Sequence, residues 1–164
     1  MQRRLLVLVR HAEAADAAVD AERPLTAHGA RRATAIGSWL AAHGVTPERA
    51  LVSPARRTVQ TWARAGGVSP VLEPRIYAAT VPALLAVVQE TPEEVDRLAV
   101  VGHDPSISGL TALLDDGQGD DAARRGCRFG FPTGGVAVFE AATPFADVAP
   151  GTARLLAFAV PGSD

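Results

Sequence analysis

A run of five apolar residues, Leu5–Val9, most constrains how this chain can fold. An uninterrupted run of this kind predicts a strand buried on both faces, as in the middle of a sheet that helices cover on both sides. Arg10 and His11 follow directly. Because ligands of open α/β sheets bind just beyond the carboxyl ends of the strands, the chain places a permanently charged guanidinium and an imidazole where ligands usually sit.

Two further apolar runs end in the same residue types. Residues 97–102 lead into His103, and residues 50–52 lead into a segment that contains Arg56 and Arg57. In a parallel sheet the carboxyl ends of the strands lie on one side. We therefore expect the arginine and histidine side chains at the three strand ends to converge.

Strand and helix patterns alternate along the rest of the chain. We expect strands at 5–10, 50–53, 70–72, 97–102, 136–139 and 153–160, and helices at 26–44, 53–65, 82–90 and 104–114. Ser53-Pro54 and Asp104-Pro105 are suitable helix starts, residues 91–94 fit a capping box that opens a short turn, and residues 12–25 and 115–130 are expected to be loops. This alternation predicts one domain over residues 1–164: an α/β fold of three layers, α/β/α, with a mostly parallel central sheet.

Composition excludes several classes of protein. The net charge of −2 gives no bias toward nucleic acid or an acidic membrane, and a five-residue apolar run is too short for a signal peptide or a membrane span. The single cysteine, Cys127, cannot form an intrachain disulfide and suits a reducing cytosol. We therefore expect a cytoplasmic monomer that binds neither nucleic acid nor membrane. With no Cys/His cluster of zinc spacing, we also expect no metal and no cofactor.

The converging residue types suit phosphoryl transfer. A phosphoryl group carries about two negative charges near neutral pH, and the planar fork of an arginine holds its oxygens bidentately. A neutral imidazole can attack phosphorus and form a covalent phosphohistidine. Nearby arginines should lower the pKa of His11 and keep it neutral near pH 7, while His103 can donate a hydrogen bond to a phosphate oxygen.

Four motifs in the expected order resemble those of the histidine phosphatase superfamily, which includes the cofactor-dependent phosphoglycerate mutases. The motifs are Arg10-His11-Ala12, residues 24–29, residues 53–61 and Gly102-His103. The resemblance implies that His11 is the nucleophile and that Arg10, Arg57 and His103 complete the phosphate site. The superfamily's second arginine falls four residues after the serine at position 53, which selects Arg57 over its neighbour Arg56.

Within the superfamily the chain is most similar to the small SixA-type phosphohistidine phosphatases, because it is short and shows no insertion for a cap domain. The branches that act on small phosphates usually carry an acid where this chain has Pro74, and Glu73 is one residue out of register. A phosphate ester needs an acid to protonate its leaving alkoxide, a contribution of about 10²–10⁴-fold. Phosphohistidine has a labile P–N bond and a less demanding leaving group. An acid-poor site therefore favours a phosphoprotein substrate, such as a histidine phosphotransfer domain or a phosphocarrier.

Several assignments remain open at this stage. Glu13 either orders the site or donates a proton there, or else it is solvated. Tyr77 either lines the site or packs, and Asp104 either caps a helix or acts as an acid. The hypothesis of an acid-poor site fails if Glu13 or Glu73 points at the phosphate with a raised pKa. The alternatives to a phosphohistidine phosphatase are a broad phosphomonoesterase for small esters and a module that binds phosphate without turnover.

A second question concerns the arginines of the 115–130 segment. Arg124, Arg125 and Arg128 either contact an acidic partner or belong to a solvated loop.

Overall fold

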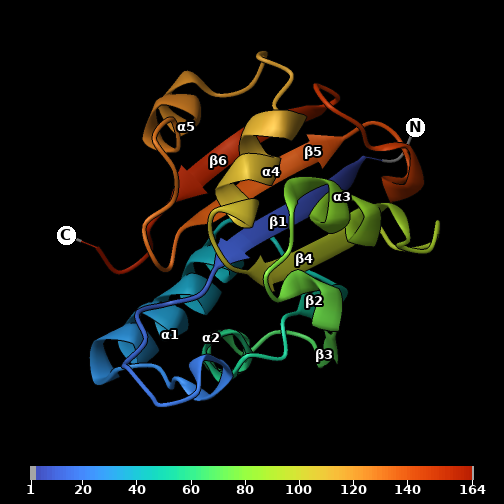
Figure 1. Cartoon of the computed structure of the whole chain (residues 1–164). Coiled ribbons are helices and arrows are strands. Elements are labelled where there is room, and N and C mark those ends of the chain that lie inside the picture. Colours follow the sequence, from blue (N-terminus) through green and yellow to red (C-terminus); the bar gives the residue numbers. More distant parts are fainter. Residues whose placement is uncertain (1–2, 164) are drawn as a thin grey trace.

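A six-stranded sheet organises the computed structural model, which describes residues 3–163 (Figure 1). The strands are β1 (Arg4–Arg10), β2 (Arg49–Val52), β3 (Pro70–Leu72), β4 (Arg97–Gly102), β5 (Val136–Ala141) and β6 (Ala153–Ala159). They lie in the order β3-β2-β4-β1-β5-β6. The pairs β1–β4, β2–β4 and β2–β3 are parallel, whereas β5 runs antiparallel to both β1 and β6. The prediction of a mostly parallel sheet is confirmed.

Helices cover both faces of this sheet and make three layers. The helices are α1 (Ala27–Ala42), α2 (Arg56–Ala65), α3 (Val81–Gln89), α4 (Ser106–Leu114) and α5 (Asp121–Gly126), with short 3₁₀ turns η1 (Asp20–Glu22), η2 (Pro74–Ile76) and η3 (Phe145–Asp147). Side chains of α1 and α2 form one hydrophobic core with the sheet, and side chains of α3, α4 and α5 form the other. The predicted three-layer α/β/α fold is therefore confirmed.

Strand β1 shows why its sequence is uninterrupted by polar residues. Leu6 and Leu8 point into the core beneath α3 and α4, while Val7 and Val9 point into the core beneath α1 and α2. All four are at most 1% exposed. A strand covered on both faces must be apolar at every position, and β1 lies inside the sheet between β4 and β5.

Helix α1 fixes the segment that follows β1. Thr26 is its N-cap, as predicted, and the Thr26 hydroxyl accepts a hydrogen bond from the Gly29 backbone N–H at 2.9 Å. The Thr26 backbone N–H in turn donates to the Glu13 carbonyl at 3.1 Å. Gly29 lies so close to the backbone of Glu13 that a Cβ atom would overlap it. This contact holds the chain just beyond His11 against the start of α1.

The two predicted Pro-containing helix starts lie too early, by two residues at Ser53 and by one residue at Asp104. Helix α2 begins at Arg56 with Ala55 at the N-cap, because the Ser53 hydroxyl contacts the His103 ring. Helix α4 begins at Ser106 with Pro105 at the cap position. The Asp104 carboxylate still stabilises its first turn by accepting hydrogen bonds from the Ser108 N–H and hydroxyl, both at 3.0 Å.

Two other local predictions need correction. The segment at 115–130 contains α5, because the Asp120 carboxylate caps the Ala123 N–H at 2.8 Å and Ala123 packs into the core. Residues 91–94 form the predicted short turn but not the predicted capping box. The Thr91 hydroxyl is buried there without a hydrogen-bond partner in the described part of the chain.

Candidate active site

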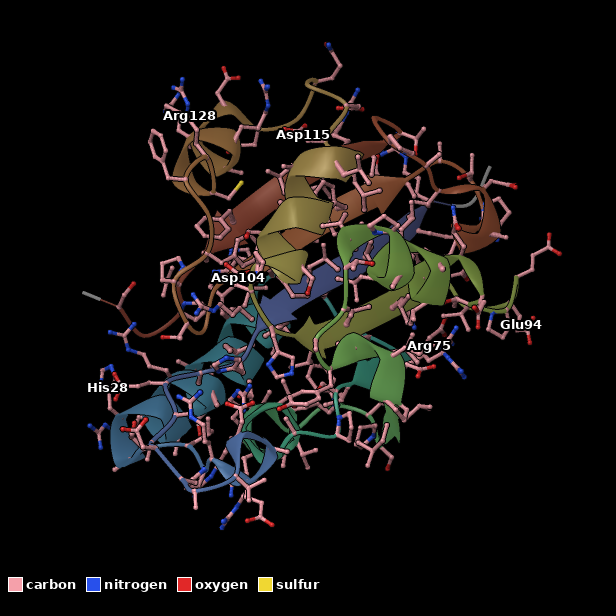
Figure 2. All side chains as sticks on the ribbon, in the orientation of Figure 1. His28, Arg75, Glu94, Asp104, Asp115 and Arg128 are labelled. Atoms are coloured by element: carbon pink, nitrogen blue, oxygen red, sulfur yellow. The ribbon has the colours of Figure 1, made fainter. Side chains whose placement is uncertain are left out.

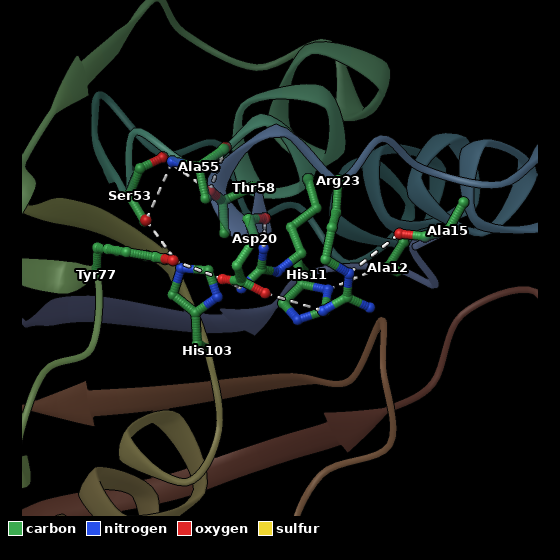
Figure 3. A network of polar contacts seen from close by, with 11 residues as sticks. His11, Ala12, Ala15, Asp20, Arg23, Ser53, Ala55, Thr58, Tyr77 and His103 are labelled. Atoms are coloured by element: carbon green, nitrogen blue, oxygen red, sulfur yellow. Dashed lines mark hydrogen bonds and ion pairs between the residues drawn. The ribbon is translucent and has the colours of Figure 1, made fainter. Parts of the chain in front are cut away.

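The carboxyl ends of β1, β2 and β4 bring four basic side chains together. These strands are neighbours in the sheet, so the residues that follow them lie at one edge. We call Arg10, His11, Arg57 and His103 the arginine–histidine cluster. The side chains of His11, Arg57 and His103 are buried, with 7%, 6% and 8% of each residue exposed. The imidazole centroids of His11 and His103 lie 5.4 Å apart, so the predicted convergence is present in the structure (Figure 3).

The hydrogen bonds of His11 define which ring nitrogen is free. Nδ1 lies 2.8 Å from the carbonyl oxygen of Ala12. Because a carbonyl oxygen only accepts, the proton of the neutral ring resides on Nδ1, and Nε2 keeps its lone pair. The backbone of His11 is also fixed: its N–H donates to the Gly102 carbonyl, and its carbonyl accepts from the Gly134 N–H.

Burial is the main reason why His11 is neutral near pH 7. It lowers the pKa of His11 to about 4, with smaller contributions in the same direction from Arg57 and Arg10. The hydrogen bond to the Ala12 carbonyl opposes this shift without cancelling it. The expectation that neighbouring arginines lower the pKa was correct in direction, but burial is the larger cause.

His103 has the same charge state for the same reason. Burial, followed by the charge of Arg57, lowers the pKa of His103 to about 4. Nε2 of the ring lies 2.8 Å from the Ser53 hydroxyl oxygen. Nδ1 is buried and has no hydrogen-bond partner among the described residues. When the Ser53 hydroxyl donates to Nε2, the proton of the neutral ring is on Nδ1 and is available to a ligand.

Protein groups bind only some of the hydrogen-bond donors of the two arginines in the cluster. Arg10 donates from Nη1 to the Phe131 carbonyl at 2.6 Å and lies 3.9 Å from the Asp104 carboxylate. Arg57 donates from Nη1 to the Asp20 carbonyl at 2.9 Å and from Nη2 to the Asp20 carboxylate at 3.1 Å. The Nε atoms of both arginines are buried without a partner in the described chain. Buried unpaired donors are costly, and an oxyanion would satisfy them.

Asp20 is the residue that sequence reasoning missed. Its Oδ2 accepts a hydrogen bond from the Tyr77 hydroxyl at 2.5 Å, and its Oδ1 accepts one from Arg23 at 3.4 Å (Figure 3). The Tyr77 hydrogen bond and the contacts with Arg57 hold the pKa of Asp20 at about 2. The side chain is 52% exposed, so Asp20 covers the solvent side of the buried Arg57. No periodicity marks Asp20, because it lies in the irregular 12–25 segment and only tertiary contacts place it.

Tyr77 also reaches the cluster. Its ring packs edge-on against that of His103, with centroids 5.5 Å apart, and its hydroxyl binds Asp20. Of the two possibilities that the sequence left open, lining the site is the one that the structure supports.

Two of the three acids considered from the sequence, Glu13 and Glu73, are not directed at the cluster, whereas the Asp104 carboxylate lies 3.9 Å from Arg10. The Glu13 carboxylate accepts a hydrogen bond from the Thr26 hydroxyl at 2.8 Å, so it points to the start of α1. Glu73 binds Arg75, which also binds Glu90, and the hydrogen bonds from Arg75 lower the pKa of Glu73. The hypothesis of an acid-poor site would fail if Glu13 or Glu73 pointed at the phosphate with a raised pKa. Because neither carboxylate points at the cluster, this condition is not met.

The arginines of the 115–130 segment lie apart from the cluster. With Cys127 they line a separate cavity of about 470 Å³ beside α4 and α5. Arg124 is paired with Asp115 at 3.0 Å. In Figure 2, Arg128 and Asp115 lie at the α5 end of the molecule, well away from Asp104 beside the cluster. Burial raises the pKa of the Cys127 thiol, which is the opposite of what a reactive cysteine requires.

Two negative findings apply to residues 3–163. No helix there is both long and apolar enough to cross a lipid bilayer. Nor do three side chains of His, Cys, Asp or Glu gather in that part of the chain in a way that could hold a metal ion. The expectation that the reaction needs no metal stays a prediction.

Acidification is expected to destabilise the fold through His11 and His103. Their pKa values fall from 6.5 to about 4 on folding, so between these values the unfolded chain binds more protons than the folded chain. The free energy of unfolding should therefore decrease as the pH falls through this window, by up to about 1.4 kcal/mol per pH unit for each histidine. Urea unfolding across the window measures this slope. His103→Gln should reduce it, and an unchanged slope would contradict the assignment.

Comparison with known proteins gives consistent matches. The sequence profile of the histidine phosphatase superfamily (branch 1) matches residues 6–79. An uncharacterized protein of Mycobacterium tuberculosis is 38% identical over 157 residues, which cover 93% of this chain and 99% of that protein. The phosphohistidine phosphatase SixA of Escherichia coli is 36% identical over 121 residues, which cover 68% of this chain and 74% of SixA.

A solved structure extends the similarity to the whole fold. A protein of Nakamurella multipartitia, assigned as a phosphohistidine phosphatase SixA, superimposes with a TM-score of 0.88 at 31% sequence identity. The match covers 99% of each chain.

Proposed function

Because this chain belongs to the histidine phosphatase superfamily, we propose that it removes phosphate from phosphohistidine in proteins through a covalent intermediate on His11. The family supports phosphatase chemistry in general. The phosphohistidine substrate is the finer proposal, which draws support from the similarity to SixA and from the ionised state of Asp20 beside the cluster.

The first step uses the free lone pair of His11. Nε2 attacks phosphorus in line with the leaving group, while the Ala12 carbonyl holds the ring in the required tautomer. Arg10 and Arg57 bind the phosphoryl oxygens and stabilise the charge of the transferring group. His103 donates a hydrogen bond to one of these oxygens. Water then attacks the phosphorylated His11 and releases inorganic phosphate.

One observation carries the preference for phosphohistidine: the Asp20 carboxyl, which lies beside the cluster, is a poor proton donor near neutral pH. The pKa of Asp20 is held at about 2 by Tyr77 and Arg57. Asp104 accepts two hydrogen bonds from Ser108. An ester that leaves as an alkoxide would depart unprotonated, which forfeits the about 10²–10⁴-fold contribution of a general acid.

A comparison of three substrates tests the proposal in the presence of a metal chelator. We expect kcat/KM to decrease from a phosphohistidine protein to an aryl phosphate and then to a sugar phosphate, because the leaving group needs more protonation in that order. The phosphohistidine protein should exceed the sugar phosphate by at least about 100-fold. If the sugar phosphate is turned over fastest, the chain is a phosphomonoesterase. Loss of activity with the chelator would contradict metal independence.

A further inference from the structure

The solvent-facing part of the site contains a carboxylate that the mechanism above does not use. Among the residues around Arg57, Asp20 is half-exposed, whereas Arg57, His11 and His103 are buried. A phosphohistidine carried on a protein must enter from solvent with its phosphoryl group first. When the phosphoryl group has reached the buried arginines, the ring behind it lies at the level of the half-exposed Asp20. Figure 3 shows Asp20 with Tyr77 and His103 on one side and His11 and Arg23 on the other.

The two oxygens of this carboxylate are unequally occupied. Oδ2 accepts hydrogen bonds from both the Tyr77 hydroxyl and Arg57 Nη2. Oδ1 receives a single long hydrogen bond, from Arg23 at 3.4 Å, among the contacts of the described chain. A carboxylate offers about four lone-pair positions, so Oδ1 can accept a further donor while Oδ2 anchors the group.

We infer that Asp20 determines specificity for the leaving group, because its Oδ1 accepts a hydrogen bond from the free ring N–H of the substrate's phosphohistidine. This inference rests on the proposed function. In the substrate ring, one nitrogen carries the phosphoryl group and the other carries this proton. The Asp20 carboxylate favours the protonated ring electrostatically, as the Ala12 carbonyl favours the Nδ1 proton of His11.

With that proton in place the transfer needs no external acid. The Nε2 lone pair of His11 forms the new P–N bond, and the substrate's P–N bond breaks with its electron pair returning to the ring nitrogen. The substrate leaves as a neutral imidazole that keeps its N–H. In the second step a water oxygen bonds to phosphorus, the His11 P–N bond breaks, and both water protons leave on dihydrogen phosphate. The substrate ring begins as a phosphorylated imidazolium and leaves neutral. His11 is neutral before and after the cycle and is a phosphorylated imidazolium between the two steps.

The same carboxylate works against phosphate esters. An ester's leaving oxygen develops negative charge, and the ionised Asp20 can neither protonate that oxygen nor stabilise its charge. Repulsion between Asp20 and the substrate phosphate is limited by Arg57 and Arg23, which both contact the carboxylate. Asp20 should therefore affect the ratio of phosphohistidine cleavage to ester cleavage more than it affects phosphate binding.

The substitution Asp20→Asn tests this role with little change in shape. The backbone carbonyl that holds Arg57 remains, and the amide oxygen can still accept from Tyr77. We expect kcat/KM for a phosphohistidine protein to fall by about 10- to 100-fold, the range of a charge-assisted hydrogen bond. Activity on an aryl phosphate should stay constant or rise. Glu22→Gln removes the same charge from an exposed position in the same turn and should leave both activities unchanged.

A pH profile distinguishes this role from a structural one. The alkaline limb of kcat/KM for the phosphohistidine protein should reflect loss of the substrate ring proton, and Asp20→Asn should move it to lower pH. The titratable and charged groups facing Asp20 are Tyr77, Arg57, Arg23 and His103. His103 titrates on the acid side. The pKa of Tyr77 is raised by Asp20 and would also fall in Asp20→Asn, but a tyrosine limb lies at about pH 10 or above, well alkaline of an imidazole ring, so its position distinguishes the two.

Each other outcome overturns the inference. Parallel loss of both activities would mean that Asp20 only orders Arg57. Parallel gain would mean that the carboxylate competes with phosphate for Arg57. If the unsubstituted protein shows no preference for the phosphohistidine protein, the proposed function itself fails and the inference fails with it. A preserved preference that Asp20→Asn does not alter would overturn the inference alone.

Discussion

Replacing His11 with alanine is expected to lower phosphatase turnover by at least about 10⁴-fold, because it removes the atom that bonds to phosphorus. Arg10, Arg57 and His103 would remain, so phosphate binding should persist while chemistry stops. Rapid-quench labelling with a ³²P phosphohistidine protein measures the effect directly. The unsubstituted enzyme should accumulate label on His11, whereas His11→Ala should acquire none.

The control for this experiment is His28→Ala, which removes an exposed histidine from α1. Both the rate and the label should match those of the unsubstituted enzyme. Turnover by His11→Ala within about tenfold of the original rate would exclude a covalent intermediate on this residue. Label on another residue of an active enzyme would assign the nucleophile elsewhere.

Replacing Arg57 with lysine is expected to cost about 10²–10³-fold in kcat/KM although the charge is kept. Arg57 uses one hydrogen of Nη1 and one of Nη2 to hold Asp20, and its Nε–H has no partner among the described residues. A lysine ammonium is a single point of charge. It cannot bind the Asp20 carbonyl and carboxylate and also present a fork to phosphate.

The neighbouring residue provides a matched control. Arg56 is exposed at the start of α2, whereas Arg57 is buried, as the spacing from Ser53 predicts. Arg56→Lys should leave kcat/KM within about twofold of its original value, in line with the small effects of surface substitutions. Equal losses for the two substitutions would show that the exposed arginine contributes as much as the buried one.

The sequence could predict the buried half of the site because strands place it. Arg10 and His103 lie at the ends of β1 and β4, which are paired along their whole length, from Leu5 with Arg97 to Arg10 with Gly102. Apolar runs identify such strands, and parallel pairing brings their ends to one edge. The choice of Arg57 followed from the spacing typical of the superfamily, and Arg57 lies on the buried face of α2.

The solvent-facing half could not be predicted in the same way. Asp20 belongs to a three-residue 3₁₀ turn with no apolar pattern, and its place depends on Tyr77, far along the chain. The role of Glu13 was left open, between a residue of the site and a solvated one, because it lies only two residues past His11 in sequence. In the structure, the hydroxyl of Thr26, the N-cap of α1, donates a hydrogen bond to the Glu13 carboxylate and turns it away from the cluster. Local spacing carries little information where contacts between distant loops decide the arrangement.

Helix α5 was missed for a different reason. Its sequence, Asp121–Gly126, is short, rich in arginine and bounded by glycines, which is typical of a loop. Ala123 packs into the core and Asp120 caps the first turn, so tertiary burial stabilises a segment that would be marginal alone.

The position of β1 inside the sheet has a consequence for the order in which the protein folds. Leu5 pairs with Arg97 on one side and with Glu140 on the other. The Gly134 N–H binds the carbonyl of His11 only when the segment before β5 is in place. During synthesis from the amino terminus, the nucleophile therefore emerges early but acquires its surroundings late. Contacts between residues so distant in sequence form slowly, so the nascent chain should remain inactive, with an exposed apolar strand, until β5 has left the ribosome.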